Sequence, residues 1–549
     1  SILGAVRFRS GRRTSLPRAR AAASCRGRCR GRAAPRMARG GAGGPGSTAA
    51  EPAPVSQKRP DAAGMQGQQS GLRDRAARWQ RQLLGRSSHE DRQPFSAWEG
   101  QLNEPNQRVI HADCERTRAD TEYFRRPEVR AKMEAMLTCW CQQQQARYKQ
   151  GLNEVLAPFL YLQFEPGEGC PTDDEVFACF GAFLKRFAPF FDSDDFVPLQ
   201  CAFVFFRRLL LYHRPDLHNL LAERSVSPDM FCMPWFLTLF ASKTPLRLTL
   251  QLWDRHLERG EPPFFVFLAA AVLANAEQAV LSAERSQLPE ILTSLGLASR
   301  EELEALWSAA EALYNRTPAT FGARLRRNVL RVGASRSAGP QKSGAGPKGS
   351  VEGEDQQAGA EASPGGLLER LEQERCFFIL PEEVVGHCYP IKASEGRKPW
   401  QPSPACPWRL LVLDLRPRAD FEAARLPAAL HFDPFSVSGP QGMAQGPWAA
   451  GRRLLQWGLE PAGALEPPRV FEALKATLGE DWVCDREAHI CLLGAAVDAN
   501  LVRSLYEVLT AQLTYWHVSV ASGGFEAVVT CARKQGFEIV RSENPQRSV

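Results

Sequence analysis

The sequence predicts an all-α domain followed by a small α/β domain with a parallel sheet. Between residues 72 and 330, apolar residues recur at helical spacing, and no strands alternate with the helices. Residues 332–365 hold almost no large apolar side chain, so they cannot bury enough surface to fold on their own. Beyond them, short continuous apolar runs alternate with helical stretches, which is typical of a parallel sheet covered by helices.

Residues 1–71 precede the predicted fold and are expected to be a disordered leader. Residues 1–50 contain twelve arginines and no acidic residue, and residues 40–70 are mostly Gly, Pro, Ala, Ser and Gln. This composition fits non-native sequence ahead of a start at Met37, and it also fits an organelle-targeting segment. Outside residues 1–50 there are 56 basic against 61 acidic residues, a net charge of −5, so we expect no nucleic-acid-binding face.

The all-α domain is predicted over residues 72–330, where loops containing Pro, Gly and Asp separate the helical stretches. The longest apolar run begins at Phe264 and is shorter than the about 20 residues that a membrane-spanning helix needs, so a buried core helix is expected there. The expected helices are residues 73–84, 130–141, 153–163, 175–187, 199–211, 230–239, 245–258, 264–281 and 301–314.

A flexible linker is predicted at residues 331–365, and the α/β domain at residues 366–545. Because the linker has no means of burying itself, the domains on either side of it are expected to fold independently. The expected strands are residues 410–415, 428–432, 488–493 and 518–521, and the helices between and after them are residues 420–424, 450–457, 469–478, 499–513 and 523–534.

The cysteines and histidines give no sign of a disulfide framework or a metal site. The 15 cysteines are scattered along the chain, mostly inside apolar runs, which is the usage of a reducing compartment. His213, His218 and His256 have no partners at the spacing of metal ligands. We therefore expect no metal and no cofactor.

Two short motifs stand out in the helical part. The first runs from Ile110 to Thr117 and fits I-x-x-D-x-x-R-T; the second runs from Tyr148 to Asn153 and fits Y-x-Q-G-x-N. With these two motifs the sequence resembles the TBC domain family, which are GTPase-activating proteins for Rab GTPases. The likeness extends to three further segments: Trp79-Gln-Arg-Gln-Leu-Leu-Gly85, Trp235-Phe-Leu-Thr-Leu-Phe240 and Leu252-Trp253-Asp254. The resemblance as a whole therefore covers about residues 72–325.

The resemblance implies roles for the residues of the two motifs. Arg116 would be a finger inserted in trans to stabilise charge on the transferring phosphoryl group, and Gln150 a second finger that aligns the attacking water. Asp113 would hold the Arg116 guanidinium. Gly151 would allow a tight turn, and Tyr148 and Asn153 support the same motif. Without the resemblance, the motif chemistry alone favours an ordinary i,i+3 ion pair between Asp113 and Arg116 and a loop-capping role for Gln150.

The C-terminal part contains Leu411-Val-Leu-Asp414-Leu-Arg416 followed by Asp420-Phe421-Glu422-Ala-Ala-Arg-Leu426-Pro427-Ala-Ala429. These segments resemble the opening D-x-R…E-F…G-H-I-P-G-A of the rhodanese fold, but they depart from the pattern of active members. Ala424 and Arg425 stand where Gly and His are usual. An active rhodanese carries a Cys thiolate in the loop after its central strand, whereas Gly494 takes that place here and Cys491 comes three residues earlier, inside the strand. The resemblance therefore implies a rhodanese-like domain that is inactive as a sulfurtransferase.

The order of the two domains resembles that of a trans-Golgi tethering protein in the TBC family, although its further C-terminal domain is absent from this sequence. One hypothesis is a Rab GTPase-activating protein in vesicle trafficking, acting on GTP-bound Rab. The alternative is a non-catalytic vesicle-tethering scaffold that binds a golgin coiled coil through the TBC domain. Either implies a cytoplasmic protein held peripherally on trans-Golgi or endosomal vesicle membranes.

Overall fold

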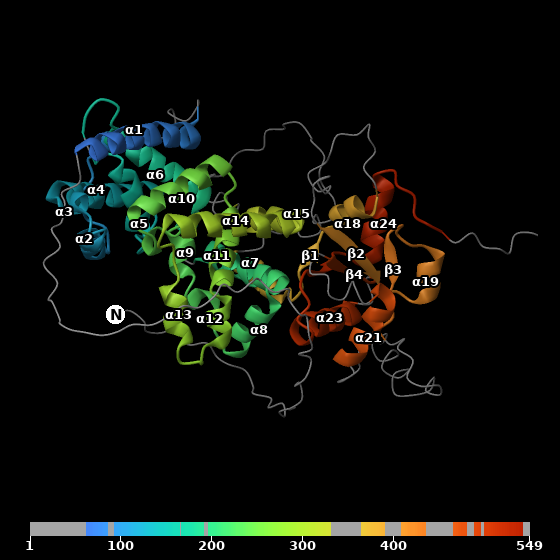
Figure 1. Cartoon of the computed structure of the whole chain (residues 1–549). Coiled ribbons are helices and arrows are strands. Elements are labelled where there is room, and N and C mark those ends of the chain that lie inside the picture. Colours follow the sequence, from blue (N-terminus) through green and yellow to red (C-terminus); the bar gives the residue numbers. More distant parts are fainter. Residues whose placement is uncertain are drawn as a thin grey trace, which may run out of the picture. The chain divides into compact units, whose positions relative to one another are not determined.

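The computed structural model describes residues 62–85, 93–164, 166–191, 196–330, 364–389, 408–434, 465–479, 488–495 and 499–541. Helices fill the first part of the chain, as the sequence predicts (Figure 1). Their bounds are α1 Ala62–Leu84, α2 Gln107–Arg116, α3 Glu122–Arg125, α4 Pro127–Gln144, α5 Leu152–Tyr161, α6 Asp173–Phe187, α7 Val197–His213, α8 Pro215–Glu223, α9 Met233–Leu237, α10 Leu246–Arg259, α11 Phe264–Asn275, α12 Glu277–Ser282, α13 Leu288–Ser294, α14 Arg300–Arg316 and α15 Ala319–Leu325.

Several of the predicted helix bounds are wrong. The helix expected over residues 230–239 covers only Met233–Leu237, and a 3₁₀ turn precedes it at Pro228–Met230. Helix α1 begins at Ala62, so residues 62–71 are helical rather than part of a disordered leader. They contain no proline to break the helix, although their three glycines disfavour it, which is why the sequence did not indicate this extension. The single helix expected over residues 264–281 breaks at Ala276 into α11 and α12. The rest of the leader, the linker from 331 to 363 and the helix expected at 450–457 lie outside the described residues.

Helix α1 is held on the helical domain by an aromatic cluster. Trp79 packs edge-on against Phe159 at 5.3 Å between ring centroids and lies 6.0 Å from Trp253. Its indole N–H also donates to Asp254 at 2.8 Å, and Asp254 forms an ion pair with Arg75 at 2.9 Å. Trp79 and the Trp253-Asp254 pair, which belong to two separate segments of the family resemblance, are thus in direct contact in the fold. No helix of the described segments is both long and apolar enough to cross a bilayer.

The second part of the chain forms a five-stranded sheet with order β1-β5-β4-β2-β3 and parallel pairing throughout (Figure 1). The strands are β1 Phe378–Ile379, β2 Arg409–Asp414, β3 Ala429–His431, β4 Ala488–Leu493 and β5 Val518–Ala521. The helices around them are α17 Pro364–Gln373, α18 Pro381–Cys388, α19 Arg418–Ala423, α21 Pro467–Leu478, α23 Ala499–Glu507 and α24 Gly524–Lys534. Four of the strands agree with the prediction; β1, with two residues, is too short to give an apolar run.

The two faces of the sheet pack against different sets of side chains. Cys491, Leu493 and Val412 belong to a core that also contains residues of α18 and α24. Ile490 and Leu492, one position along β4 in each case, belong to the large core that also contains the helical domain. This follows from the two-residue period of a strand, which sends successive side chains to opposite faces.

The two parts are in extensive contact in the folded chain, and whether each folds without the other stays a prediction. The described residues from Ala62 onward belong to one compact unit, and the cores of the helical domain and of one sheet face are continuous. Phe321 of α15 stacks on Phe377 beside β1 at 5.6 Å, and Arg208 of α7 forms an ion pair with Glu374 at 3.0 Å. Linker composition says nothing about whether the flanking surfaces fit each other, so the sequence could not reveal this contact.

Imidazoles lie at the centre of this contact. The side chains of Tyr212 and His489 form a buried hydrogen bond of 2.5 Å between Oη and Nδ1. His489 stacks between Trp408 and His517, with 4.1 Å between ring centroids on each side. His517 also lies 3.1 Å from Nδ1 of His213 through its Nε2. Burial lowers the pKa of His213 and of His489 well below the ordinary value, so both rings are neutral near pH 7.

Candidate functional site

The first motif ends helix α2 with a buried carboxylate beside an exposed guanidinium. Asp113 is almost fully buried, whereas the Arg116 side chain is 59% exposed. Arg116 Nη2 lies 2.5 Å from Asp113 Oδ1. The ion pair therefore holds one edge of the Arg116 guanidinium, while the rest of the side chain is exposed to solvent.

Tyr148 joins the second motif to the first. Its hydroxyl lies 2.8 Å from Asp113 Oδ2 and 3.2 Å from Asn153 Oδ1, so it donates to one of these two acceptors. Burial and the neighbouring Asp113 carboxylate raise the pKa of Tyr148 well above its usual value, which keeps the hydroxyl protonated. The two oxygens of Asp113 thus face Arg116 on one side and Tyr148 on the other.

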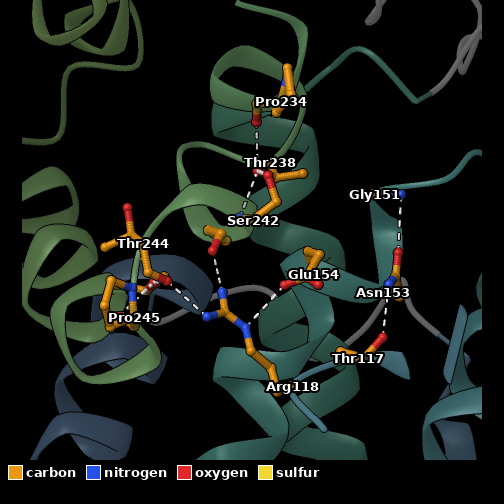
Figure 2. Close-up of polar contacts among 12 residues, drawn as sticks. Thr117, Arg118, Gly151, Asn153, Glu154, Pro234, Thr238, Ser242, Thr244 and Pro245 are labelled. Carbon is orange, nitrogen blue, oxygen red and sulfur yellow. Dashed lines mark hydrogen bonds and ion pairs between the residues drawn. The ribbon is translucent and has the colours of Figure 1, made fainter. Parts of the chain in front are cut away.

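Asn153 completes the connection from the start of helix α5. Its Oδ1 accepts from the backbone N–H of Gly151 at 3.0 Å, and its Nδ2 donates to the Thr117 hydroxyl at 2.8 Å (Figure 2). The Thr117 hydroxyl in turn donates to the backbone carbonyl of Asp113 at 2.6 Å. Gln150, the residue before Gly151, is exposed. The two predicted finger residues therefore lie on segments that a buried polar network ties together.

Gly151 meets both conditions that require glycine. Its φ of +117° lies in the region that other residues rarely adopt, and a Cβ placed there would lie 3.2 Å from Leu237 Cδ2 and 3.3 Å from Thr238 Cγ2. The tight turn that the motif implies for this residue is present.

We expect the substitution Gly151→Ala to lower the free energy of unfolding by roughly 1–3 kcal/mol, because it forces an unfavourable φ and a close contact with α9. Urea unfolding of the full chain would measure this. Gly181→Ala is the matched control: it lies within α6 and its added Cβ meets nothing within 4 Å. A change as small as that of Gly181→Ala would contradict the strain assigned to Gly151.

Arg118 also belongs to this region, although it lies outside both motifs. Its Nη1 donates to the carbonyl of Thr244 at 2.8 Å, its Nη2 donates to the carbonyl of Ala241, and its Nε lies 3.0 Å from Glu154 Oε2 (Figure 2). Its position two residues after the finger arginine is the only signal of it in the sequence. Periodicity could not reveal its contacts, since Arg118 and Thr244 are 126 residues apart.

His213, His218 and His256 all lie in packed or hydrogen-bonded positions. His213 lies in the contact between the two parts of the chain, with its Nε2 2.7 Å from the Thr317 hydroxyl. His256 is buried edge-on against Trp307, and burial lowers its pKa to about 3. His218 lies beside Asn219 on α8 with its pKa lowered by burial. In the described part of the chain no three metal-ligating side chains converge.

At the carboxyl end of the sheet, Asp414 and Arg416 are buried and paired at 2.7 Å. The guanidinium of Arg416 lies over the ring of Phe525, and the N–H of Phe525 donates to the carbonyl of Gly494. Residues 496–498, which follow Gly494 and include Asp498, lie outside the described residues. Cys491 is fully buried in β4, and burial raises the pKa of its thiol well above the usual value.

The Cys491 thiol is expected to react with iodoacetamide at least 10-fold more slowly in the folded chain than in urea, because the reactive thiolate is suppressed and the sulfur is not accessible. Mass spectrometry of the alkylated peptide would measure the two rates. Cys531, which is partly exposed on α24, serves as the internal reference in the same digest. Equal rates for Cys491 and Cys531 in the folded chain would contradict this prediction. Thiosulfate sulfurtransferase turnover that is lost in Cys491→Ser would show that this part is active, contrary to the expectation from its sequence.

Residues 73–281 match the family model described as the Rab-GTPase-TBC domain. The mouse "TBC domain-containing protein kinase-like protein" is 27% identical over 362 residues, which cover 63% of this chain and 37% of that protein. The likeness is thus longer than residues 73–281, and the chain spans little more than a third of this relative. "GTPase-activating protein GYP5" of Saccharomyces cerevisiae is 30% identical over 137 residues, covering 24% of this chain and 14% of the relative.

Among solved structures, the "Ypt/Rab-GAP domain of Gyp1p" is similar with a TM-score of 0.35 and 15% identity, covering 46% of this chain and 82% of that one. The family model confirms the predicted helical domain class. The relatives named here are not TBC domain family member 23, the tethering protein whose domain order the sequence resembles. That resemblance and the rhodanese-like assignment of the sheet stay predictions.

Proposed function

We propose that the Rab-GTPase-TBC domain of residues 73–281 accelerates GTP hydrolysis by a GTP-bound Rab GTPase, with Arg116 and Gln150 supplied in trans. The observation that carries the proposal is the pairing of two exposed finger residues on segments joined through Asp113 and Tyr148. The names of the relatives support the same class of activity, since GYP5 is a GTPase-activating protein.

The geometry suits the charge that develops in phosphoryl transfer. The contact with Asp113 engages Nη2 of Arg116, which leaves other guanidinium N–H groups for the oxygens of the transferring phosphoryl group. Because Asp113 is buried, its charge acts on Arg116 through little water and orients the guanidinium before a GTPase arrives. Gln150 has an amide that can both donate and accept, which is what aligning an attacking water requires.

A panel of purified Rab GTPases loaded with GTP tests this function. The full chain is added in catalytic amounts, and phosphate release is followed for each Rab with and without it. We expect at least one Rab to respond and Arg116→Ala to remove most of the response. Failure of every Rab to respond would overturn the catalytic proposal.

A second candidate is a non-catalytic tethering scaffold, peripheral on trans-Golgi or endosomal vesicles, that binds a golgin coiled coil. This candidate rests on the resemblance of the domain order to that of TBC domain family member 23, and the golgin would be bound through the TBC domain. The buried Cys491 thiol argues only against a sulfurtransferase role for the sheet part. Binding of a golgin coiled coil to the full chain, unchanged in Arg116→Ala, would support the scaffold. Loss of that binding in Arg116→Ala would count against it, because a scaffold does not need the finger.

A further inference from the structure

We infer that Arg118 is a positioning residue that fixes the segment carrying Arg116 relative to the segment carrying Gln150. The effect of Arg118 on catalysis by the two fingers rests on the proposed GTPase-activating function. The structural link that Arg118 makes between the two segments does not depend on that function. Arg118 touches neither finger directly in any contact described above. It acts through the main chain on which Arg116 lies and through the helix that follows Gln150.

The guanidinium of Arg118 connects three segments that are distant in the sequence. Arg118 itself follows helix α2; Glu154 lies in the first turn of α5; Ala241 and Thr244 belong to the turn between α9 and α10. The side chain is only 11% exposed, and its charge is balanced by Glu154, whose side chain is 22% exposed. An arginine suits this place because its planar fork can donate to two carbonyls while its remaining N–H side faces a carboxylate.

The backbone of Arg118 indicates that these contacts hold it in place. Its φ is +48°, in the left-handed region that costs a non-glycine residue on the order of 1 kcal/mol. Such a conformation persists when the surroundings determine it. Here the side-chain contacts to Glu154 and to the 241–244 turn supply that determination, so loss of the guanidinium frees the chain just after Thr117.

The same turn also supports Gly151, the neighbour of Gln150. A Cβ on Gly151 would meet Leu237 and Thr238, so the main chain of the second motif lies directly against the end of α9. The Thr238 hydroxyl donates to the Pro234 carbonyl at 2.6 Å and accepts from the Ser242 N–H at 3.1 Å, which connects α9 to the 241–244 turn (Figure 2). Arg118 and Gly151 thus both pack against one segment, residues 234–244.

Hydrogen exchange measured by mass spectrometry tests the coupling on the full chain without any Rab. In Arg118→Met, we expect amide exchange to become about 10-fold faster both in residues 113–118 and in residues 148–155. Arg186→Met is the matched control, because Arg186 on α6 also donates to two main-chain carbonyls, those of Gln82 and Gly260. It should leave exchange in both motif segments unchanged. No change in Arg118→Met, or a change in residues 113–118 alone, would overturn the coupling.

Kinetics on a responsive Rab then separate positioning from a general loss of folded protein. We expect Arg118→Met to lower kcat about 10-fold with KM within twofold, and Arg118→Lys to recover part of kcat because it keeps the charge facing Glu154. In an Arg116→Ala background, Arg118→Met should cause little further loss, since the position of Gln150 relative to Arg116 no longer matters once the Arg116 side chain is removed. An equal loss in both backgrounds would overturn positioning. If no Rab responds to the wild type, the proposed function fails, and the exchange experiment still decides the coupling.

Discussion

Replacing Arg116 with alanine is expected to lower Rab-stimulated GTP hydrolysis on the order of 10²-fold or more, because an arginine supplied in trans acts mainly on the charge of the transition state. The side chain is largely exposed beyond its contact with Asp113, so its removal opens no cavity. We therefore expect the loss in kcat in a chain that still folds, with a lower free energy of unfolding because the buried Asp113 keeps Tyr148 but loses its charged partner. Single-turnover phosphate release with saturating protein measures the effect on the chemical step.

Gln150→Ala is expected to cause a loss of comparable size, since water alignment and charge stabilisation act in the same step. Arg418→Ala is the matched control for Arg116→Ala. Arg418 is also an exposed arginine paired with a carboxylate on its own helix, Glu422, at 2.8 Å, but it lies in the sheet part. It should change the stimulated rate less than twofold. Equal activity of the wild type and Arg116→Ala on a responsive Rab would refute the role of the finger.

Acidification from pH 7.5 to 5.5 is expected to lower the free energy of unfolding by about 5 kcal/mol through buried imidazoles, at about 1.4 kcal/mol per imidazole for each pH unit below its unfolded pKa. Burial lowers the pKa of His213 and His489, that of His256 to about 3 and that of His387 to about 4. The folded chain thus binds these four protons less readily than the unfolded chain. The stability they contribute is present above pH 6.5 and is lost as the pH falls toward 4.

Urea unfolding at a series of pH values measures this loss. His256→Leu should reduce it by about one imidazole's share, because the substituted chain has one buried titrating ring fewer. His111→Gln should not reduce it, since His111 is exposed beside Glu134 and its pKa is raised rather than lowered. A free energy of unfolding that stays constant between pH 7.5 and 5.5 would contradict the neutral state assigned to the buried rings.

The candidate site could be predicted to a large extent because its residues lie in two short motifs. Asp113 and Arg116 are three residues apart on one helix, and Tyr148, Gly151 and Asn153 lie within six positions. A pattern of this kind can be recognised in the linear sequence because its residues are close together along the chain. The hydrogen bond from Tyr148 to Asp113 could not be predicted, since it joins the two motifs across 35 positions.

The linear sequence is enough to predict the class of each part, the buried strands 488–493 and 518–521 and the residues of the two motifs. These features depend on local period and residue type, because a strand buried on both faces needs an unbroken apolar run and a tight turn needs glycine. Tertiary structure alone decided the left-handed backbone of Arg118, the two-residue strand β1 and the stack of His489 on His517. Each of these depends on surfaces brought together from distant segments, where packing and burial outweigh local preference.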